Sequence, residues 1–316
     1  MIIIAPTAYK GTIAASAAAR AMAAGVRSFS DEPLLIQPVS DGGPGLLDAF
    51  EQRGGELHRV VVRGPLGDDV TARILVQNGS AIVESADACG LHLVPPQRRD
   101  PAQLDTFGVG QLLRAAAGLG VERVVVGLGG SATVDGGVGM AAALEGTPIA
   151  RPVIALADVQ TQLRDAARIF GPQKGATPTQ VQMLEAALAK LLEITGVPDF
   201  AGAGAAGGLA YGLRAFVNAE VVSGSEWVLR ETGLEQQIPS ARALITGEGS
   251  YDSQSFLGKI TGALVAAART HRVPVLVIAG RCDHTDDYAL AIERPGATLT
   301  EDDLAQLVRQ HLPRIV

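Results

Sequence analysis

One stretch of this 316-residue chain reads Gly127-Leu-Gly-Gly-Ser-Ala-Thr-Val-Asp-Gly-Gly-Val-Gly-Met-Ala141. It follows an apolar, β-branched run at residues 121–126 and leads into a run of small residues. The pattern predicts a strand that ends in glycines and opens into a helix, whose backbone N–H groups and positive end can bind an anion. Ser131, Thr133 and Asp135 add hydroxyl and carboxylate groups that suit a phosphate-bound metal. Glycine-rich turns often serve only chain geometry, so this turn alone leaves a structural role and a ligand role open.

The composition favours an α/β protein and argues against a general nucleic-acid surface. Hydrophobic residues make up 47% of the chain and glycine contributes 38 residues, whereas aromatic residues are few. A chain of this length predicts two domains of ordinary size. The formal net charge of −7 disfavours nucleic-acid binding, which needs clustered basic residues. Anionic small substrates are not excluded, because local cations and helix ends can bind them.

The cysteines and the apolar runs indicate neither a redox centre nor a membrane anchor. Cys89 and Cys282 are far apart and match no metal or redox spacing. No apolar run approaches the ~20 residues of a membrane span. The opening strand is cut off by Ala5-Pro6 and carries no basic leader. We therefore expect a cytoplasmic protein with no membrane partner.

The first fifty residues predict a parallel sheet. Strands and helices alternate there, at Ile2–Ala5, Ser16–Val26, Leu34–Val39 and a helix that reaches Phe50. The ligands of such sheets gather at the carboxyl ends of the strands. Lys10 and Asp41 lie in the loops that follow the two strands, so both are candidates for a binding site.

The pattern changes at Gly64-Pro-Leu-Gly67. Three strands are predicted close together, at Val60–Val62, Thr71–Val76 and Ser80–Glu84. The Asn78-Gly79 pair between the last two is typical of a type I′ hairpin. This antiparallel pairing predicts a second domain. The strand-then-loop pattern returns in three later segments, at Val153–Val159, Ala243–Thr246 and Val273–Ala279.

Two polar or glycine-rich loops follow the turn. The first, Phe170-Gly-Pro-Gln-Lys-Gly-Ala-Thr177, holds Lys174 and is followed by Pro178, where a helix is expected to begin. The second is Gly202-Ala-Gly-Ala-Ala-Gly-Gly208. Its small residues fit close packing and a ligand role equally well.

The strand-end loops share the groups that phosphoryl transfer requires. Ammonium groups and a metal neutralise phosphates, and a carboxylate orients or deprotonates the attacking hydroxyl. The candidates are Lys10, Lys174, Lys259, Asp41, Asp135, Asp252 and Glu248. The chain contains no Walker A sequence, no protein-kinase signature and no dinucleotide-binding GxGxxG with its acidic partner. These residues alone are compatible with a phosphate-handling enzyme outside those three classes, but they leave other functions open.

Short motifs with these residues follow one another along most of the chain: Ile4-Ala-Pro6, Tyr9-Lys-Gly-Thr12, Pro38-Val-Ser-Asp-Gly-Gly43, Gly64-Pro-Leu-Gly67, Gly129-Gly-Ser-Ala-Thr133, Asp135-Gly-Gly137, Phe170-Gly-Pro-Gln-Lys-Gly-Ala-Thr-Pro178, Gly202-Ala-Gly-Ala-Ala-Gly-Gly-Leu209, Thr246-Gly-Glu-Gly249, Asp252-Ser-Gln254 and Gly258-Lys259. In this order they resemble the motifs of the bacterial type I glycerate kinases. The resemblance implies phosphorylation of D-glycerate by ATP and Mg²⁺, with 2-phosphoglycerate as the product. The partners it implies are therefore small molecules.

The resemblance also implies an α/β fold of two domains. A flavodoxin-like parallel-sheet domain would be formed by both chain ends, residues 1–63 and 240–316. A mixed-sheet α/β domain, residues 64–239, would be inserted between them. The predicted hairpin between two parallel-type regions agrees with this arrangement.

We expect the motif residues to share the chemistry as follows. Catalytic roles fall to Lys10, Asp41, Asp135 and Asp252, and the three aspartates share the base and Mg²⁺ roles without a choice among them. Binding of substrate or phosphate falls to Gly42, Gly43, Gly129, Gly130, Ser131, Thr133, Lys174, Glu248 and Lys259.

The chain departs from the family pattern at several polar positions of the expected cleft. The family usually has Asp-Ser at Thr7-Ala8, Glu at Pro44, Asn at Val134 and Arg at Ser250, and its Asp-Val-Thr-Asn stretch reads Asp158-Val-Gln-Thr161 here. The family has a longer segment between the helix after the glycine turn and the strand at Val153, and in this chain only Gly146–Pro152 remains of it. Each lost hydrogen-bonding group costs ~1–3 kcal/mol of binding. Two alternatives therefore stay open: a kinase of another small hydroxy or sugar acid, and a non-catalytic ligand-binding relative.

Overall fold

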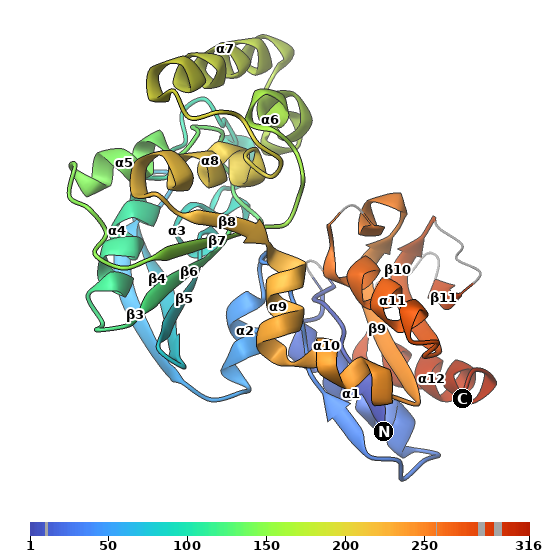
Figure 1. The fold of residues 1–316 in the computed structure, drawn as a ribbon. Helices are drawn as coiled ribbons and strands as arrows, with labels where there is room; N and C mark the ends of the chain where they lie inside the picture. Colours follow the sequence, from blue (N-terminus) through green and yellow to red (C-terminus); the bar gives the residue numbers. More distant parts are fainter. Residues whose placement is uncertain (10–11, 257, 284–287, 294–298) are drawn as a thin grey trace. The chain divides into compact units, whose positions relative to one another are not determined.

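The computed structural model describes residues 1–9, 12–256, 258–283, 288–293 and 299–316, and it forms two compact units. Unit 1 comprises Met1–Asp41 with Ser225–Val316, and unit 2 comprises Gly42–Gly224. One unit has a parallel sheet and the other a mixed sheet, so the predicted α/β class is confirmed (Figure 1).

Unit 1 is built on a five-stranded parallel sheet. Its strands are β1 (Ile2–Ile4), β2 (Leu34–Ile36), β9 (Ala243–Tyr251), β10 (Val275–Cys282) and β11 (Ala289–Glu293). The spatial order β2-β1-β9-β10-β11 is the 2-1-3-4-5 order of flavodoxin-like folds. In such sheets ligands bind where the order reverses, which here is at the carboxyl ends of β1 and β9.

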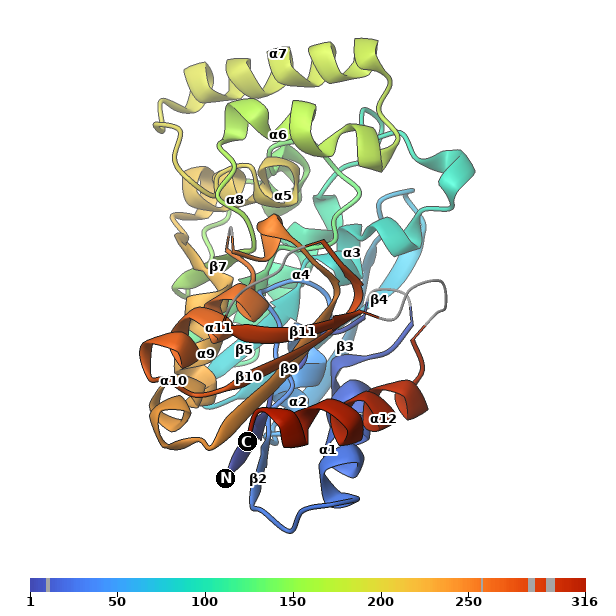
Figure 2. The same ribbon diagram turned by 90° about the vertical axis from the view of Figure 1, so that its right-hand side faces the viewer.

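Helices cover both faces of this sheet. The helices of the unit are α1 (Ala15–Arg27), α9 (Gly224–Thr232), α10 (Leu234–Gln237), α11 (Ile260–Thr270) and α12 (Glu301–His311). Figure 2 shows α1 and α12 on one face and α11 on the other. Because side chains alternate along a strand, Ile2 and Ile4 pack with α1 and α12, whereas Ile3 is buried on the opposite face.

Unit 2 is built on a six-stranded mixed sheet in the order β3-β4-β5-β6-β7-β8. The strands are β3 (Glu56–Arg63), β4 (Asp69–Gln77), β5 (Ser80–Glu84), β6 (Arg123–Gly127), β7 (Val153–Ala157) and β8 (Glu220–Ser223). The first two pairings are antiparallel, and those from β5 to β8 are parallel. Asn78 and Gly79 between β4 and β5 have φ values of 47° and 72°, which confirms the predicted type I′ geometry.

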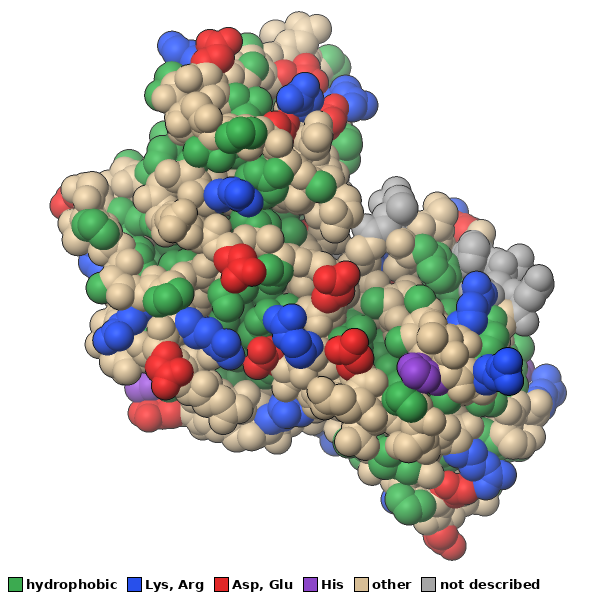
Figure 3. Space-filling model, in the orientation of Figure 1, with side chains coloured by type: hydrophobic (Ala, Val, Ile, Leu, Met, Phe, Trp, Pro, Cys, Tyr) green, Lys and Arg blue, Asp and Glu red, His purple; other side chains and the backbone are tan. Residues whose placement is uncertain are grey.

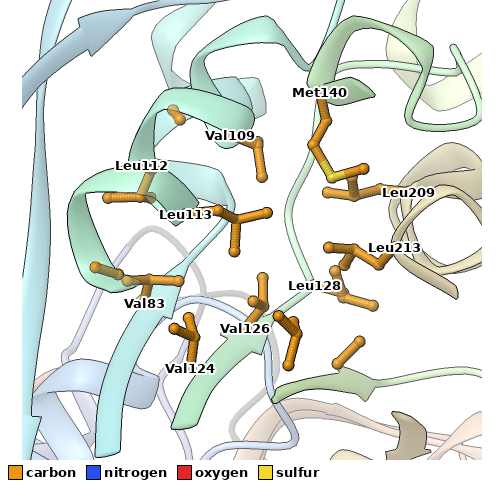
Figure 4. Close-up of a cluster of buried hydrophobic side chains, with 14 of the residues drawn as sticks. Val83, Val109, Leu112, Leu113, Val124, Val126, Leu128, Met140, Leu209 and Leu213 are labelled. Atoms are coloured by element: carbon orange, nitrogen blue, oxygen red, sulfur yellow. The ribbon is translucent and has the colours of Figure 1, made fainter. Parts of the chain in front are cut away.

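The helices of unit 2 are α2 (Leu46–Glu51), α3 (Ala86–Cys89), α4 (Phe107–Ala117), α5 (Val138–Leu144), α6 (Leu163–Phe170), α7 (Pro178–Thr195) and α8 (Ala205–Val217). Figure 4 shows a hydrophobic core of the unit, in which valines of β5 and β6 face leucines of α4 and α8: Val83, Val124, Val126, Leu112, Leu113, Leu209 and Leu213. This core fixes the end of β6, where the glycine turn begins.

The boundaries between the units differ from those expected at residues 63/64 and 239/240. β3 pairs with β4 along its whole length, from Glu56 opposite Val76 to Arg63 opposite Asp69. This ladder places β3 in the sheet of unit 2, so the boundary lies before it, after Asp41. The second boundary lies between Gly224 and Ser225, directly after β8.

The surface carries charges of both signs. Figure 3 shows Lys and Arg side chains interspersed with Asp and Glu on one face of the described chain, without an extended basic patch there. Such a face does not favour nucleic acid. None of the described helices is long and apolar enough to span a bilayer.

Candidate active site

The glycine turn divides into two halves with different surroundings. We call residues 128–133 its first half and residues 134–140 its second half. The pairing of Gly127 with Leu156 between β6 and β7, continued by two residues, brings Gly129 beside Asp158. The Gly129 N–H donates to the Gly42 carbonyl oxygen at 3.3 Å, and a Cβ atom on Gly129 would overlap Gly43. Glycine is required at 129 because two backbone segments meet there.

The first half leaves backbone donors available. Neither the Gly130 N–H nor the Ser131 N–H donates to any residue that the structure describes, although the Gly130 carbonyl accepts from Leu91 N at 2.9 Å. Gly130 is exposed, whereas Ser131 is 5% exposed. An anionic oxygen bound here would meet two N–H donors in surroundings that are partly shielded from water, where each hydrogen bond is stronger.

Lys174 supports this half from inside the protein. It ends a short 3₁₀ helix (Pro172–Lys174) and is only 4% exposed. Its Nζ atom donates to Ser131 Oγ and to the Thr133 carbonyl oxygen, each at 2.8 Å. Since the Ser131 hydroxyl accepts from the ammonium group, its own proton is directed to another acceptor.

Burial governs the titration of Lys174. Removal of the ammonium group from water lowers the pKa of Lys174 to about 8, and the carboxylates of Asp158 and Asp135 oppose this fall. Near neutral pH the lysine is therefore still charged. The charged ammonium group polarises the Ser131 hydroxyl, to which it donates a hydrogen bond.

The second half is internally saturated. Asp135 Oδ2 accepts from Thr106 N at 2.9 Å, Thr106 Oγ1 at 2.8 Å and Gly139 N at 3.0 Å, and Oδ1 accepts from Gly137 N at 3.1 Å. Thr106 Oγ1 in turn accepts from Met140 N at 2.9 Å. The expectation that the start of α5 offers unpaired N–H groups is thus wrong for residues 137, 139 and 140, because a carboxylate and a hydroxyl of the protein already bind them.

Val134 does not face a cleft. It is 1% exposed and packs among Leu163, Leu188 and Tyr211. The expectation that this valine removes a polar group from the cleft is therefore wrong, because its side chain lies in an apolar core. Close packing also explains the second glycine loop, since a Cβ atom on Gly207 would overlap the Thr133 carbonyl oxygen.

Two residues that are not among the predicted site residues lie at the same edge of the sheet. Asp158 directly follows β7, and its Oδ2 atom would be 3.1 Å from a Cβ atom on Gly129. The sequence pattern predicts a strand to Val159 and so hides this aspartate inside it. In the structure the strand ends at Ala157, which makes Asp158 the first residue of the loop at the carboxyl edge of the sheet.

The second such residue, Glu84, ends β5 and is 3% exposed. Its Oε1 atom accepts from Gly45 N at 3.0 Å and Leu47 N at 2.9 Å, so it caps α2 behind the Gly42-Gly43 loop. Burial raises the pKa of Glu84 to about 7.

Unit 1 carries a second group of predicted residues, at its own sheet edge. Lys259 Nζ lies 3.3 Å from Glu248 Oε2, and burial raises the pKa of Glu248 while Lys259 opposes the rise. Tyr9 OH donates to the Ile278 carbonyl at 2.7 Å and fills the space where a Gly247 side chain would lie. The backbone N–H and the hydroxyl of Thr7 both donate to the Gly247 carbonyl. These contacts fix the chain that leads to Lys10, which lies outside the described residues.

Asp41 and Asp252 occupy other positions in unit 1. Asp41 is half-buried and directly precedes Gly42. Asp252 follows the end of β9 and accepts from Ser250 Oγ at 3.0 Å, while its N–H donates to Ser255 Oγ at 3.2 Å.

The predicted residues thus fall into three sets. Those around the first half of the turn in unit 2 are Gly42, Gly43, Gly129, Gly130, Ser131, Thr133 and Lys174. Asp135 belongs to the saturated second half. Those in the described part of unit 1 are Asp41, Glu248, Asp252 and Lys259.

Comparison with known proteins identifies the family of this chain. A family model described as the glycerate kinase family matches residues 2–163 and 147–298. The chain is 38% identical to a glycerate kinase of Halalkalibacterium halodurans (88% of this chain, 85% of that protein) and 36% identical to the glycerate 2-kinase of Escherichia coli (92% and 87%). A crystal structure from Salmonella typhimurium LT2, described as a glycerate kinase 2, matches with a TM-score of 0.82 and 32% identity (99% and 97%).

Proposed function

Because this chain belongs to the glycerate kinase family, we propose that it transfers the γ-phosphoryl group of ATP to a hydroxyl group of D-glycerate and forms 2-phosphoglycerate. The observation that carries the proposal is the donor set in the first half of the turn. Two N–H groups that have no partner among the described residues, and a serine hydroxyl polarised by a buried ammonium group, suit the carboxylate of a small acid.

The groups of unit 1 suit the polyphosphate. Lys259 beside Glu248 supplies a cation at the carboxyl end of β9, the edge at which doubly wound sheets bind nucleotides. Lys10 precedes the described Thr12 in the loop after β1, and we assign it to the same phosphates. Phosphoryl transfer depends mainly on such positioning and on neutralisation of charge.

Mg²⁺ would be held by few protein ligands. Among the described residues no group of three or more His, Cys, Asp or Glu side chains forms a metal cage. Mg²⁺ in kinases usually binds one or two carboxylates together with phosphate oxygens and water, so aspartates on separate loops fit this ion. Asp41 and Asp252 meet that description. Asp135 does not, because four donors already fill its oxygens. Bound Mg²⁺ would neutralise the transferred phosphoryl group.

A coupled assay tests the proposed reaction. The protein is incubated with ATP, Mg²⁺ and D-glycerate, and the product is passed directly to enolase. We expect phosphoenolpyruvate to form without phosphoglycerate mutase. A signal that appears only after phosphoglycerate mutase is added contradicts 2-phosphoglycerate as the product. No signal with enolase alone or with enolase and the mutase contradicts D-glycerate as the acceptor. A screen of sugar acids by ADP release then tests the alternative acceptors.

A further inference from the structure

If the first half of the turn binds the carboxylate of the acid, the reacting hydroxyl group of that acid would lie close to Asp158. This aspartate continues β7 at the carboxyl edge of the sheet, in register with Gly129, and its Oδ2 atom faces that glycine. The donors of Gly130 and Ser131 follow one and two residues further along the same turn. A three-carbon acid that places its carboxylate on these donors extends only a few ångströms, which is the reach to a neighbouring strand ~4.8 Å away.

The charges around Asp158 fit a proton acceptor. The carboxylate interacts attractively with the buried ammonium group of Lys174. A nearby cation favours the ionised form of a carboxylate, which is the form that can accept a proton. Lys174 also donates to Ser131 and to the Thr133 carbonyl. The same cation therefore interacts both with the residues that would bind the substrate carboxylate and with Asp158.

The other aspartate of the turn is unsuited to this role. Asp135 accepts four hydrogen bonds from backbone and hydroxyl donors, about as many as a carboxylate can accept. Proton transfer to it would break this network, which joins the start of α4 to the start of α5. Asp158 lies outside these two helices, in the loop between β7 and α6.

We propose that Asp158 is the catalytic base of the phosphoryl transfer, an inference that rests on the proposed function. The hydroxyl oxygen of the acid attacks the γ-phosphorus of ATP and forms a new O–P bond. The bond from the γ-phosphorus to the β,γ-bridging oxygen breaks, and its electron pair leaves with ADP. The hydroxyl proton passes to a carboxylate oxygen of Asp158 and then to water.

Three variants test this role by ADP release. Asp158→Asn keeps the size of the side chain but removes the base, and we expect kcat to fall by about 10²–10⁴-fold with a much smaller change in KM. Asp158→Ala leaves room for a small acid, so added formate should restore part of kcat in this variant and not in Asp158→Asn. The matched control is Asp165→Asn in α6, where a half-buried carboxylate pairs with Arg168 at 2.6 Å, and it should behave as the wild type.

The outcomes separate this inference from the proposed function. Wild-type protein that releases no ADP with D-glycerate or with any sugar acid contradicts the proposed function. Active wild type together with an Asp158→Asn protein of undiminished kcat contradicts only the role of Asp158. Recovery of Asp158→Asn by excess Mg²⁺, without rescue of Asp158→Ala by formate, also overturns it, because the carboxylate would then be a metal ligand. Thermal unfolding of each variant confirms that it is folded.

Discussion

The two halves of the glycine turn use similar residues for opposite purposes. In the first half, Gly130 and Ser131 keep N–H groups without a partner among the described residues, and the side chain of Ser131 is polarised by Lys174. In the second half, the Asp135 carboxylate and the Thr106 hydroxyl accept hydrogen bonds from the N–H groups at the start of α5. In our proposal the first half binds the ligand, and the second half holds the first half in place. A glycine-rich sequence alone does not distinguish these roles, since both need left-handed backbone and small side chains.

Among the variants that compare the two halves, the largest effect is expected from Lys174→Met. The substitution removes the ammonium group and leaves two acceptors of the first half, Ser131 Oγ and the Thr133 carbonyl, without their donor. Loss of charged hydrogen bonds that stabilise a binding site typically costs about 3–4 kcal/mol, so kcat/KM for D-glycerate should fall by about 10²–10³-fold. Lys190→Met on the exposed side of α7 serves as the control and should retain full activity. Equal activity of the two variants would remove Lys174 from the site.

The pH dependence of Lys174 should move activity and stability in opposite directions. Its pKa falls from 10.5 when exposed to about 8 in the folded protein. Between these values the unfolded chain binds more protons, so the free energy of unfolding rises with pH, by up to about 3 kcal/mol for this group. Activity should fall over the same range as the ammonium group is lost.

Denaturant unfolding of wild type and Lys174→Met at pH 7.5, 9 and 10.5 measures this effect. The difference between the two proteins should shift in favour of the wild type as the pH rises. A constant difference across the range would show that Lys174 titrates normally.

Asp135→Asn should damage the second half and spare the first. The amide keeps one oxygen acceptor but places an NH₂ group among backbone donors, which leaves buried N–H groups unpaired at about 1–3 kcal/mol each. We expect a free energy of unfolding lower by about 2–4 kcal/mol and kcat within a few-fold of the wild type at temperatures where the variant is folded. Thr106→Ser, which keeps the hydroxyl, should be milder than Thr106→Val. A folded Asp135→Asn protein without activity would return Asp135 to the list of catalytic candidates.

The smallest effect on activity is expected at Val134. Val134→Ala removes two methyl groups from a buried cluster and should cost about 1–2 kcal/mol of stability. Val134→Asn restores the residue of the family pattern but buries an amide and should also destabilise the protein. Neither variant should change KM for D-glycerate by more than about twofold, since the side chain faces the core. A large change in KM would place this position in the site after all.

Local patterns predicted much of the fold. The strand at Ser80–Glu84 has the bounds expected from the sequence, and Asn78-Gly79 adopts the positive φ values that its hairpin requires. The helix after Pro178 begins there with a Thr177 capping box. The strand order of unit 1 follows from pairings between residues more than two hundred positions apart, such as Ile2 with Ala243, and no local pattern encodes them. The family resemblance supplied this part.

The site was harder to predict because partners in it are distant in sequence. Asp135 is saturated by Thr106, 29 residues earlier, and only the packing of α4 against α5 brings the two together. Val134 and Asp135 are adjacent, yet one faces an apolar core and the other a polar network, and strand alternation does not apply within a turn. Asp158 was hidden because an apolar run does not mark the residue at which a strand ends.

Titration calorimetry of D-glycerate tests the contrast between the two halves most directly. The acid is titrated into wild type, Ser131→Ala and Asp135→Asn at a temperature where all three are folded. We predict that Ser131→Ala weakens binding about tenfold or more, because a hydrogen bond to a charged group contributes about 1.5–3 kcal/mol, and that Asp135→Asn binds within about twofold of the wild type. Unchanged binding by Ser131→Ala together with lost binding by Asp135→Asn would contradict the account.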